Sequence, residues 1–225
     1  MKKYSIAIDG PSGAGKSTIS KTVAQKMGIV HIDTGAIYRT IGLYFYNRGI
    51  ECTDAEKIVP LLDKINIELE ITDDGQKMLL DGVDVSKDIR QHHISQCASQ
   101  VSAIPQVREH LLSLQRDFAK KQSVVMDGRD IGTVVLPDAD IKLFLTASPE
   151  SRAQRRYEEL LVRGENVSYE KILEDVKTRD YNDSHREIAP LKPADDSIMV
   201  DTTGFELEES INKIIGIIEE KIKCF

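Results

Sequence analysis

The chain has 225 residues, of which 40% are hydrophobic and 30% charged, enough for one main globular unit with an appendage. The net charge of −7 argues against binding to a long nucleic-acid backbone, but leaves room for a small anion held by local arginines. Three cysteines without a C-x-x-C pair fit neither a disulfide framework nor a zinc site, and favour a reducing compartment. No apolar run has the length of a signal peptide or membrane span, so we expect a cytoplasmic protein away from membranes.

The first predicted strand, residues 4–9, runs directly into a G-x-x-x-x-G-K-S sequence, and a helix is predicted over 18–27. Strand, glycine-rich loop and helix together indicate a phosphate-binding loop, in which backbone N–H groups surround a polyphosphate. We expect Lys16 to reach the β and γ phosphates, and the hydroxyl of Ser17 or Thr18 to ligate Mg²⁺. The residues of this predicted site are Gly10, Pro11, Ser12, Gly13, Ala14, Gly15, Lys16, Ser17 and Thr18.

Further along the chain, short apolar runs alternate with helical patterns. This alternation is typical of an α/β fold with a parallel sheet and helices on both faces. The predicted strands are 30–33, 123–126, 141–145 and 197–200, and the predicted helices are 36–47, 149–163 and 207–222.

One region, residues 65–85, breaks this alternation. Apolar residues with a period of two lie on both sides of Asp73-Asp74-Gly75, which is the signature of a β-hairpin. Helical segments are predicted on either side, over 54–64 and over 89–119 with a break near Pro105. We therefore expect a small antiparallel insert with substrate contacts at its edges.

Candidate ligand-binding residues follow two of the predicted strands. The end of the strand 30–33 and the start of the next helix carry Thr34 and Arg39, which we expect near the phosphate loop. The other strand ends in Asp127, in a position suited to magnesium, followed by Arg129 and Asp130, which would project toward the ligand. A solvated turn with a surface ion pair is an equally good interpretation of this second cluster.

Arginines dominate the region between residues 151 and 186. Two predicted helices joined at Gly164 carry them, and arginine rather than lysine favours a mobile lid that binds phosphate. We expect either Arg155 or Arg156 to reach a transferring phosphoryl group from this lid.

Four motifs together resemble the bacterial cytidylate kinases, a family of P-loop nucleoside monophosphate kinases. The resemblance runs essentially end to end. It implies a P-loop fold with a five-stranded parallel core at about 1–35, 120–150 and 187–225, a monophosphate-binding region at about 36–119, and a lid at about 151–186. The motifs are residues 9–16, 33–39, 127–133 and 189–191.

The resemblance also implies roles for individual residues. ATP phosphates would lie on residues 10–18, and CMP or dCMP would be the acceptor. The acceptor phosphate would be bound by Arg39, Arg129 and Arg186, the cytosine by Ser99, Arg108 and Asp130, and the ribose by Arg179 and Asp183, with Thr34 at the same site.

The expected reaction is direct transfer of the γ-phosphoryl group of ATP to CMP without a general base. Mg²⁺ with Lys16, Arg129 and a lid arginine would offset the repulsion between the two anions. Asp130 would disfavour uracil, whose O4 brings no proton. The family implies a monomer. Another P-loop kinase, acting on UMP, AMP or dTMP, and a nucleotide-binding switch are the alternative interpretations.

Overall fold

The computed structural model describes residues 3–72 and 75–223 and is built around a five-stranded parallel sheet. The strand order is β2-β6-β1-β7-β8, which confirms the predicted fold class. Because this sheet is covered on both faces, its inner strands are nearly continuous apolar runs. The strands are β1 (Ser5–Asp9), β2 (Val30–Asp33), β6 (Val124–Gly128), β7 (Ile141–Thr146) and β8 (Ile198–Asp201).

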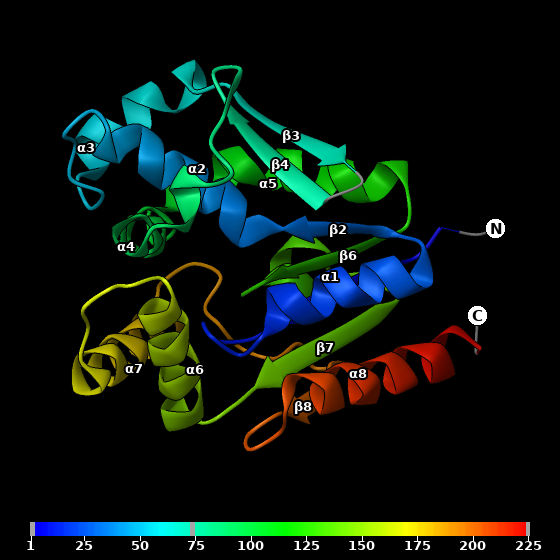
Figure 1. Cartoon of the computed structure of the whole chain (residues 1–225). Coiled ribbons are helices and arrows are strands. Elements are labelled where there is room, and N and C mark those ends of the chain that lie inside the picture. The colour runs from blue at the N-terminus through cyan, green and yellow to red at the C-terminus, as the bar shows by residue number, and fades with distance from the viewer. Residues whose placement is uncertain (1–2, 73–74, 224–225) are drawn as a thin grey trace.

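Helices cover the two faces of the sheet (Figure 1). One face packs on α1 (Lys16–Met27) and α8 (Leu207–Ile222), whose buried isoleucines meet those of β1. The other face packs on α5 (Pro105–Lys121) and on η3 (Ile131–Val135), a single π-helical turn that the sequence pattern did not predict.

The region predicted to bind the monophosphate has a hydrophobic core of its own, between α2, α4 and the insert hairpin. The hairpin is confirmed by β3 and β4, although residues 73–74 of its predicted turn lie outside the described residues. A third strand of two residues, too short to show a period in sequence, joins the insert. The elements are α2 (Thr34–Tyr46), α3 (Ala55–Ile58), η1 (Val59–Lys64), β3 (Ile67–Thr72), β4 (Gly75–Leu80), β5 (Val83–Asp84), η2 (Asp88–Arg90) and α4 (His92–Val101).

The predicted pair of arginine-rich helices is also confirmed. They are α6 (Pro149–Val162) and α7 (Tyr169–His185), separated by a turn at Gly164, whose φ of 77° suits glycine. The helices pack on each other through a small core of Ala153, Leu160 and Ile172. Among the described residues, none of the helices is both long and apolar enough to cross a bilayer.

Polar residues lie at the carboxyl ends of the central strands. In the sheet register Asp33 is opposite Asp127, and Asp9 is opposite Gly128. This end of the sheet faces α4, α6 and α7, while both chain termini lie at the far end (Figure 1). The topology therefore gathers the predicted site residues between the sheet, the monophosphate-binding region and the arginine-rich helices.

Close packing of α2 on α4 generates the first prediction. A Cβ at Gly42 would lie 3.1 Å from both Cys97 Cβ and Ala98 N, whereas a Cβ at Gly216 in α8 meets nothing within 4 Å. We expect Gly42→Val to destabilise the protein by about 1–3 kcal/mol through overpacking. Gly216→Ala, the control, should stabilise it by about 0.5–1 kcal/mol through helix propensity. Urea unfolding measures both, and an unchanged midpoint for Gly42→Val would contradict the packing argument.

Candidate active site

The phosphate loop has the geometry that its sequence predicts. Gly10, Gly13 and Gly15 have φ angles of 147°, 77° and 85°, which side-chain-bearing residues rarely adopt. A Cβ at Gly10 would lie 1.9 Å from the carbonyl oxygen of Leu145, so only glycine fits there. The loop ends at the start of α1, and no side chain caps that helix terminus. Its free N–H groups and partial positive charge suit a polyphosphate.

Lys16 is buried beneath this loop, and its Nζ donates a hydrogen bond to the carbonyl oxygen of Pro11 at 2.7 Å. Burial, and then the nearby charge of Arg129, hold the pKa of Lys16 well below its ordinary value. A phosphate bound in the loop would place a negative charge beside the Lys16 ammonium and so favour its charged form.

The Asp127 carboxylate connects three elements at the end of the sheet. Its Oδ2 accepts a hydrogen bond from the Ser17 hydroxyl at 2.7 Å, and its Oδ1 lies 2.6 Å from His31 Nε2. A carboxylate and a hydroxyl are hard oxygen donors, so these residues fit a Mg²⁺ ion that takes its other ligands from water and phosphate. Of the two predicted hydroxyls, the one that faces Asp127 is that of Ser17. The role of His31 beside this carboxylate was not predicted from the sequence.

Asp9 fixes the backbone that follows Asp130. Its carboxylate accepts hydrogen bonds from the backbone N–H groups of Ile131 and Gly132, both at 2.7 Å. Burial raises the pKa of Asp9 to about 6, although these two hydrogen bonds act in the opposite direction. This role was not predicted, because the partners lie more than a hundred residues apart in sequence.

Several of these groups line a cleft of about 690 Å³, which lies between the end of the sheet, the helices α2 and α4, and the helices α6 and α7. Ten lysine or arginine side chains line it, against six carboxylates, although the chain as a whole carries a net charge of −7. The cleft is therefore suited to anions. Its basic residues are Lys16, Arg39, Arg90, Arg108, Arg129, Arg152, Arg156, Arg163, Arg179 and Arg186.

Inside the cleft, the predicted acceptor residues form ion pairs with one another. Arg108 and Arg186 both contact the Asp130 carboxylate, the second at 3.5 Å. Arg129 Nε donates to Asp183 Oδ2 at 2.9 Å, and Arg179 Nε lies 3.9 Å from the same oxygen. Asp130 and Asp183 thus each hold two guanidinium groups.

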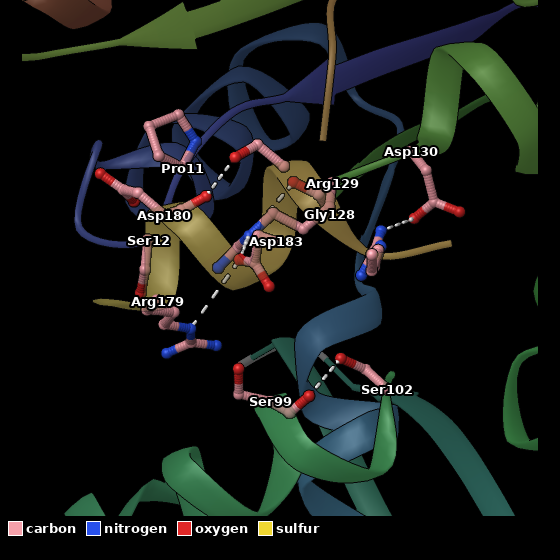
Figure 2. A network of polar contacts seen from close by, with 12 residues as sticks. Pro11, Ser12, Ser99, Ser102, Gly128, Arg129, Asp130, Arg179, Asp180 and Asp183 are labelled. Atoms are coloured by element: carbon pink, nitrogen blue, oxygen red, sulfur yellow. Dashed lines mark hydrogen bonds and ion pairs between the residues drawn. The ribbon is translucent and has the colours of Figure 1, made fainter. Parts of the chain in front are cut away.

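Figure 2 shows Arg179 and Asp183 pointing toward one another, with Ser99 on the helix across the cleft from them. Ser99 lines the cleft, and its carbonyl oxygen accepts the hydroxyl of Ser102 at 2.8 Å. The Nε atoms of Arg39 and Arg179 are buried without a hydrogen-bond partner among the described residues, so both can still bind an anion.

Thr34 and Arg39 lie where α2 leaves the sheet. The buried Thr34 hydroxyl donates to the backbone carbonyl of Asp127 at 2.8 Å, so it joins two strand ends and is already satisfied. Arg39 Nη2 donates to Asp33 Oδ2 at 2.7 Å, and Asp33 also caps α2 by accepting from Ala36 N. Arg39 is thereby held at the mouth of the cleft.

The two candidate lid arginines point in different directions. Arg155 does not line the cleft, because its guanidinium donates to the carbonyl oxygens of Thr202 and Phe205, at 3.0 and 3.4 Å. Of the two arginines between which the sequence left the choice open, Arg155 therefore points away from the cleft. Arg156 does line the cleft, where it pairs with Glu159 at 2.8 Å and approaches His92 Nδ1 at 3.4 Å.

The cleft-lining residues of α6 form a single stripe, which explains this difference. Residues 152, 156, 159 and 163 follow one another at intervals of four, three and four, so they share one helix face. Arg152, to which we had assigned no role, is nearly fully buried there. It donates to Ser12 O at 3.1 Å and pairs in bidentate fashion with Asp180, at 2.9 and 2.5 Å.

Comparison with known proteins identifies the family of this chain. The sequence pattern of the family described as Cytidylate kinase matches residues 6–220. The chain belongs to the cytidylate kinase family. The cytidylate kinase of Caldicellulosiruptor saccharolyticus is 52% identical over 217 residues, which cover 96% of each chain. That of Bacillus subtilis is 47% identical over 220 residues, covering 98% of each.

A solved structure extends the likeness of fold to a more distant protein. An uncharacterized protein from Eubacterium ventriosum has a TM-score of 0.54 at 16% identity, covering 97% of this chain and 99% of its own. At this identity the likeness concerns the fold alone.

The contact between Ser17 and Asp127 generates the second prediction. We expect Ser17→Ala to raise the MgCl₂ concentration needed for half-maximal ATP binding by about tenfold, because a hydroxyl that faces the carboxylate is lost. Thr18→Ala is the matched control and should change it less than twofold. Titration of MgCl₂ at fixed ATP, followed by calorimetry, measures both. Equal effects of the two changes would contradict the assignment of Ser17.

Proposed function

We propose that this cytidylate kinase family member transfers the γ-phosphoryl group of ATP to CMP and dCMP, giving ADP and CDP or dCDP. The observation that carries the proposal is that one cleft holds both a phosphate loop and two ion pairs, Arg108 with Asp130 and Arg129 with Asp183. The former suits a polyphosphate donor, and the latter suit a base and the phosphate of a monophosphate.

Asp130 and Arg108 would read the cytosine. The exocyclic amine of cytosine donates hydrogen bonds and needs an acceptor such as the Asp130 carboxylate, whereas its O2 and N3 need a donor such as Arg108. Asp130 is buried and contacts the guanidinium groups of Arg108 and Arg186, so its carboxylate is fixed in the cleft. Ser99 would contribute a further polar contact to the base, and Arg179 with Asp183 would hold the ribose.

The acceptor phosphate would bind Arg39, Arg129 and Arg186, and the donor phosphates would bind residues 10–18. The acceptor oxygen is already negative at neutral pH, so the reaction requires no general base. Lys16, Arg129 and Arg156 would lower the repulsion between the two anions and stabilise the charge of the transferring group. Ser17 and, through water, Asp127 would hold a Mg²⁺ ion, whose positive charge would offset part of the negative charge of the phosphates.

The separate hydrophobic cores support a division into parts that move. We propose that the core (about 1–35, 120–150 and 187–225), the monophosphate-binding region (about 36–119) and the lid (about 151–186) close on the two substrates and exclude water. We also propose that the protein is a monomer in the cytoplasm, and that it acts on free nucleotides and not on polymeric nucleic acid.

The third prediction tests the substrate. ADP release from Mg-ATP should be selective for CMP and dCMP when these, UMP, AMP and dTMP are offered separately. In Asp130→Asn the amide replaces a pure acceptor by a group that also donates, so kcat/KM for CMP should fall about 10–100-fold while discrimination against UMP weakens. Asp138→Asn, at an exposed aspartate, is the control.

Activity with AMP or dTMP alone would retain the phosphate loop and overturn the acceptor site. Transfer to none of the five nucleotides, together with binding of guanine nucleotides, would favour the nucleotide-binding switch.

The fourth prediction separates the two lid arginines. Arg156→Ala should lower kcat roughly 10²–10³-fold, because a charge aimed into the cleft is lost. Arg155→Ala should leave kcat within about threefold and lower thermal stability slightly, because it removes only hydrogen bonds to Thr202 and Phe205. Steady-state kinetics at saturating substrates decides, and the reverse order of effects would contradict the assignment.

A further inference from the structure

The side chain of Gln76, at the start of β4, bonds the insert hairpin to the end of the core sheet. Its Oε1 accepts a hydrogen bond from the backbone N–H of Asp33 at 2.8 Å, and its Nε2 donates to the backbone carbonyl of Asp33 at 3.3 Å. β2 is the edge strand of the five-stranded sheet, with β6 as its neighbour. The Gln76 amide therefore occupies the place of a neighbouring strand's peptide group at the end of β2.

Asp33 ends β2 and caps α2, the helix that carries Arg39. Its backbone is held by Gln76, and its carboxylate both caps α2 and pairs with Arg39 at 2.7 Å. The following residue, Thr34, ties the same turn to the backbone of Asp127. A displacement of the Asp33 backbone would thus move the Arg39 guanidinium.

Gln76 is itself well fixed on the insert side. Its Nε2 also lies 3.0 Å from the sulfur of Met78, which is buried in the hydrophobic core of the monophosphate-binding region. The backbone of Met78 donates to the Ser86 hydroxyl at 2.9 Å. A continuous series of contacts therefore connects the core of the insert, through Gln76 and Asp33, to Arg39.

We propose that Gln76 is a positioning residue for the acceptor nucleotide: by holding the Asp33 backbone, it sets the place of the Arg39 guanidinium. The inference rests on the proposed function, since Arg39 is there assigned to the phosphate of CMP. It assigns the insert hairpin a part in acceptor binding, although none of its described residues lines the cleft.

The fifth prediction tests this with three single variants. Gln76→Met keeps the length of the side chain and removes both hydrogen-bonding groups. We expect it to raise the KM for CMP and the Kd for CMP about 5–20-fold, and to leave the KM for ATP within twofold. Gln76→Glu keeps the acceptor, loses the donor and adds a charge beside Asp33, so it should weaken CMP binding at least as much. Lys77→Met, at the exposed neighbouring position, is the matched control and should change neither constant.

A double-mutant cycle with Arg39→Ala distinguishes positioning from a merely structural role. If Gln76 acts through Arg39, Gln76→Met should weaken CMP binding in the unmodified chain and add less than twofold in the Arg39→Ala background. Equal effects in both backgrounds, or a lowered melting temperature with an unchanged Kd for CMP, would overturn the inference. Absence of CMP turnover in the unmodified chain would instead overturn the proposed function.

Discussion

The cleft depends on buried guanidinium groups that outnumber the carboxylates holding them. Asp130 and Asp183 each face two arginines, and each lies almost fully out of solvent. Such charges are stable in the interior only when they are paired, and removal of one partner leaves an uncompensated buried charge. The carboxylates fix the arginines in place before substrate arrives.

The pairing leaves a surplus of positive charge. Burial and the neighbouring Arg129 lower the pKa of Arg179 to about 10, and the same two causes lower that of Lys16. These shifts mean that the charged forms are destabilised relative to water. A phosphate group would offset that cost at either position, so the electrostatics of the cleft favour anionic ligands.

Much of this arrangement could be predicted from the sequence. The phosphate loop, the strands that end in Asp33 and Asp127, and the arginine-rich helix pair are local patterns, and parallel topology then brings the strand ends together. The hairpin was predicted for the same reason, because its alternation of residues is local. What local patterns cannot contain is a side chain that bonds to a distant backbone, such as Asp9 to Ile131 or Gln76 to Asp33.

Consecutive helical residues present a different difficulty. Arg155 and Arg156 are the same residue type, yet their side chains project about 100° apart around the helix axis, so only one can face the cleft. The choice is set by the helix phase, which follows from the burial of Ala153 and Leu160 against α7. The interval of four between Arg152 and Arg156 shows that the two share a helix face. This could have identified Arg156 only if Arg152 had been known to face the cleft. His31 was missed because it becomes informative only beside the Asp127 carboxylate.

The contacts of α6 extend across the cleft, from the phosphate loop to the region proposed to bind the acceptor. At the base of α6, Arg152 binds both the phosphate loop, at Ser12 O, and α7, at Asp180. Near its other end, Arg163 donates to the backbone carbonyl of Arg90 and Arg156 approaches His92, both on the acceptor side. One helix therefore touches the donor loop at its start and the acceptor region toward its end. A polyphosphate that shifts the loop would shift the base of α6, and the arginine stripe would carry that movement across the cleft. In the proposed closure, coupling through this one helix would make the movement depend on both substrates and would keep water from the transferring group until the acceptor is in place.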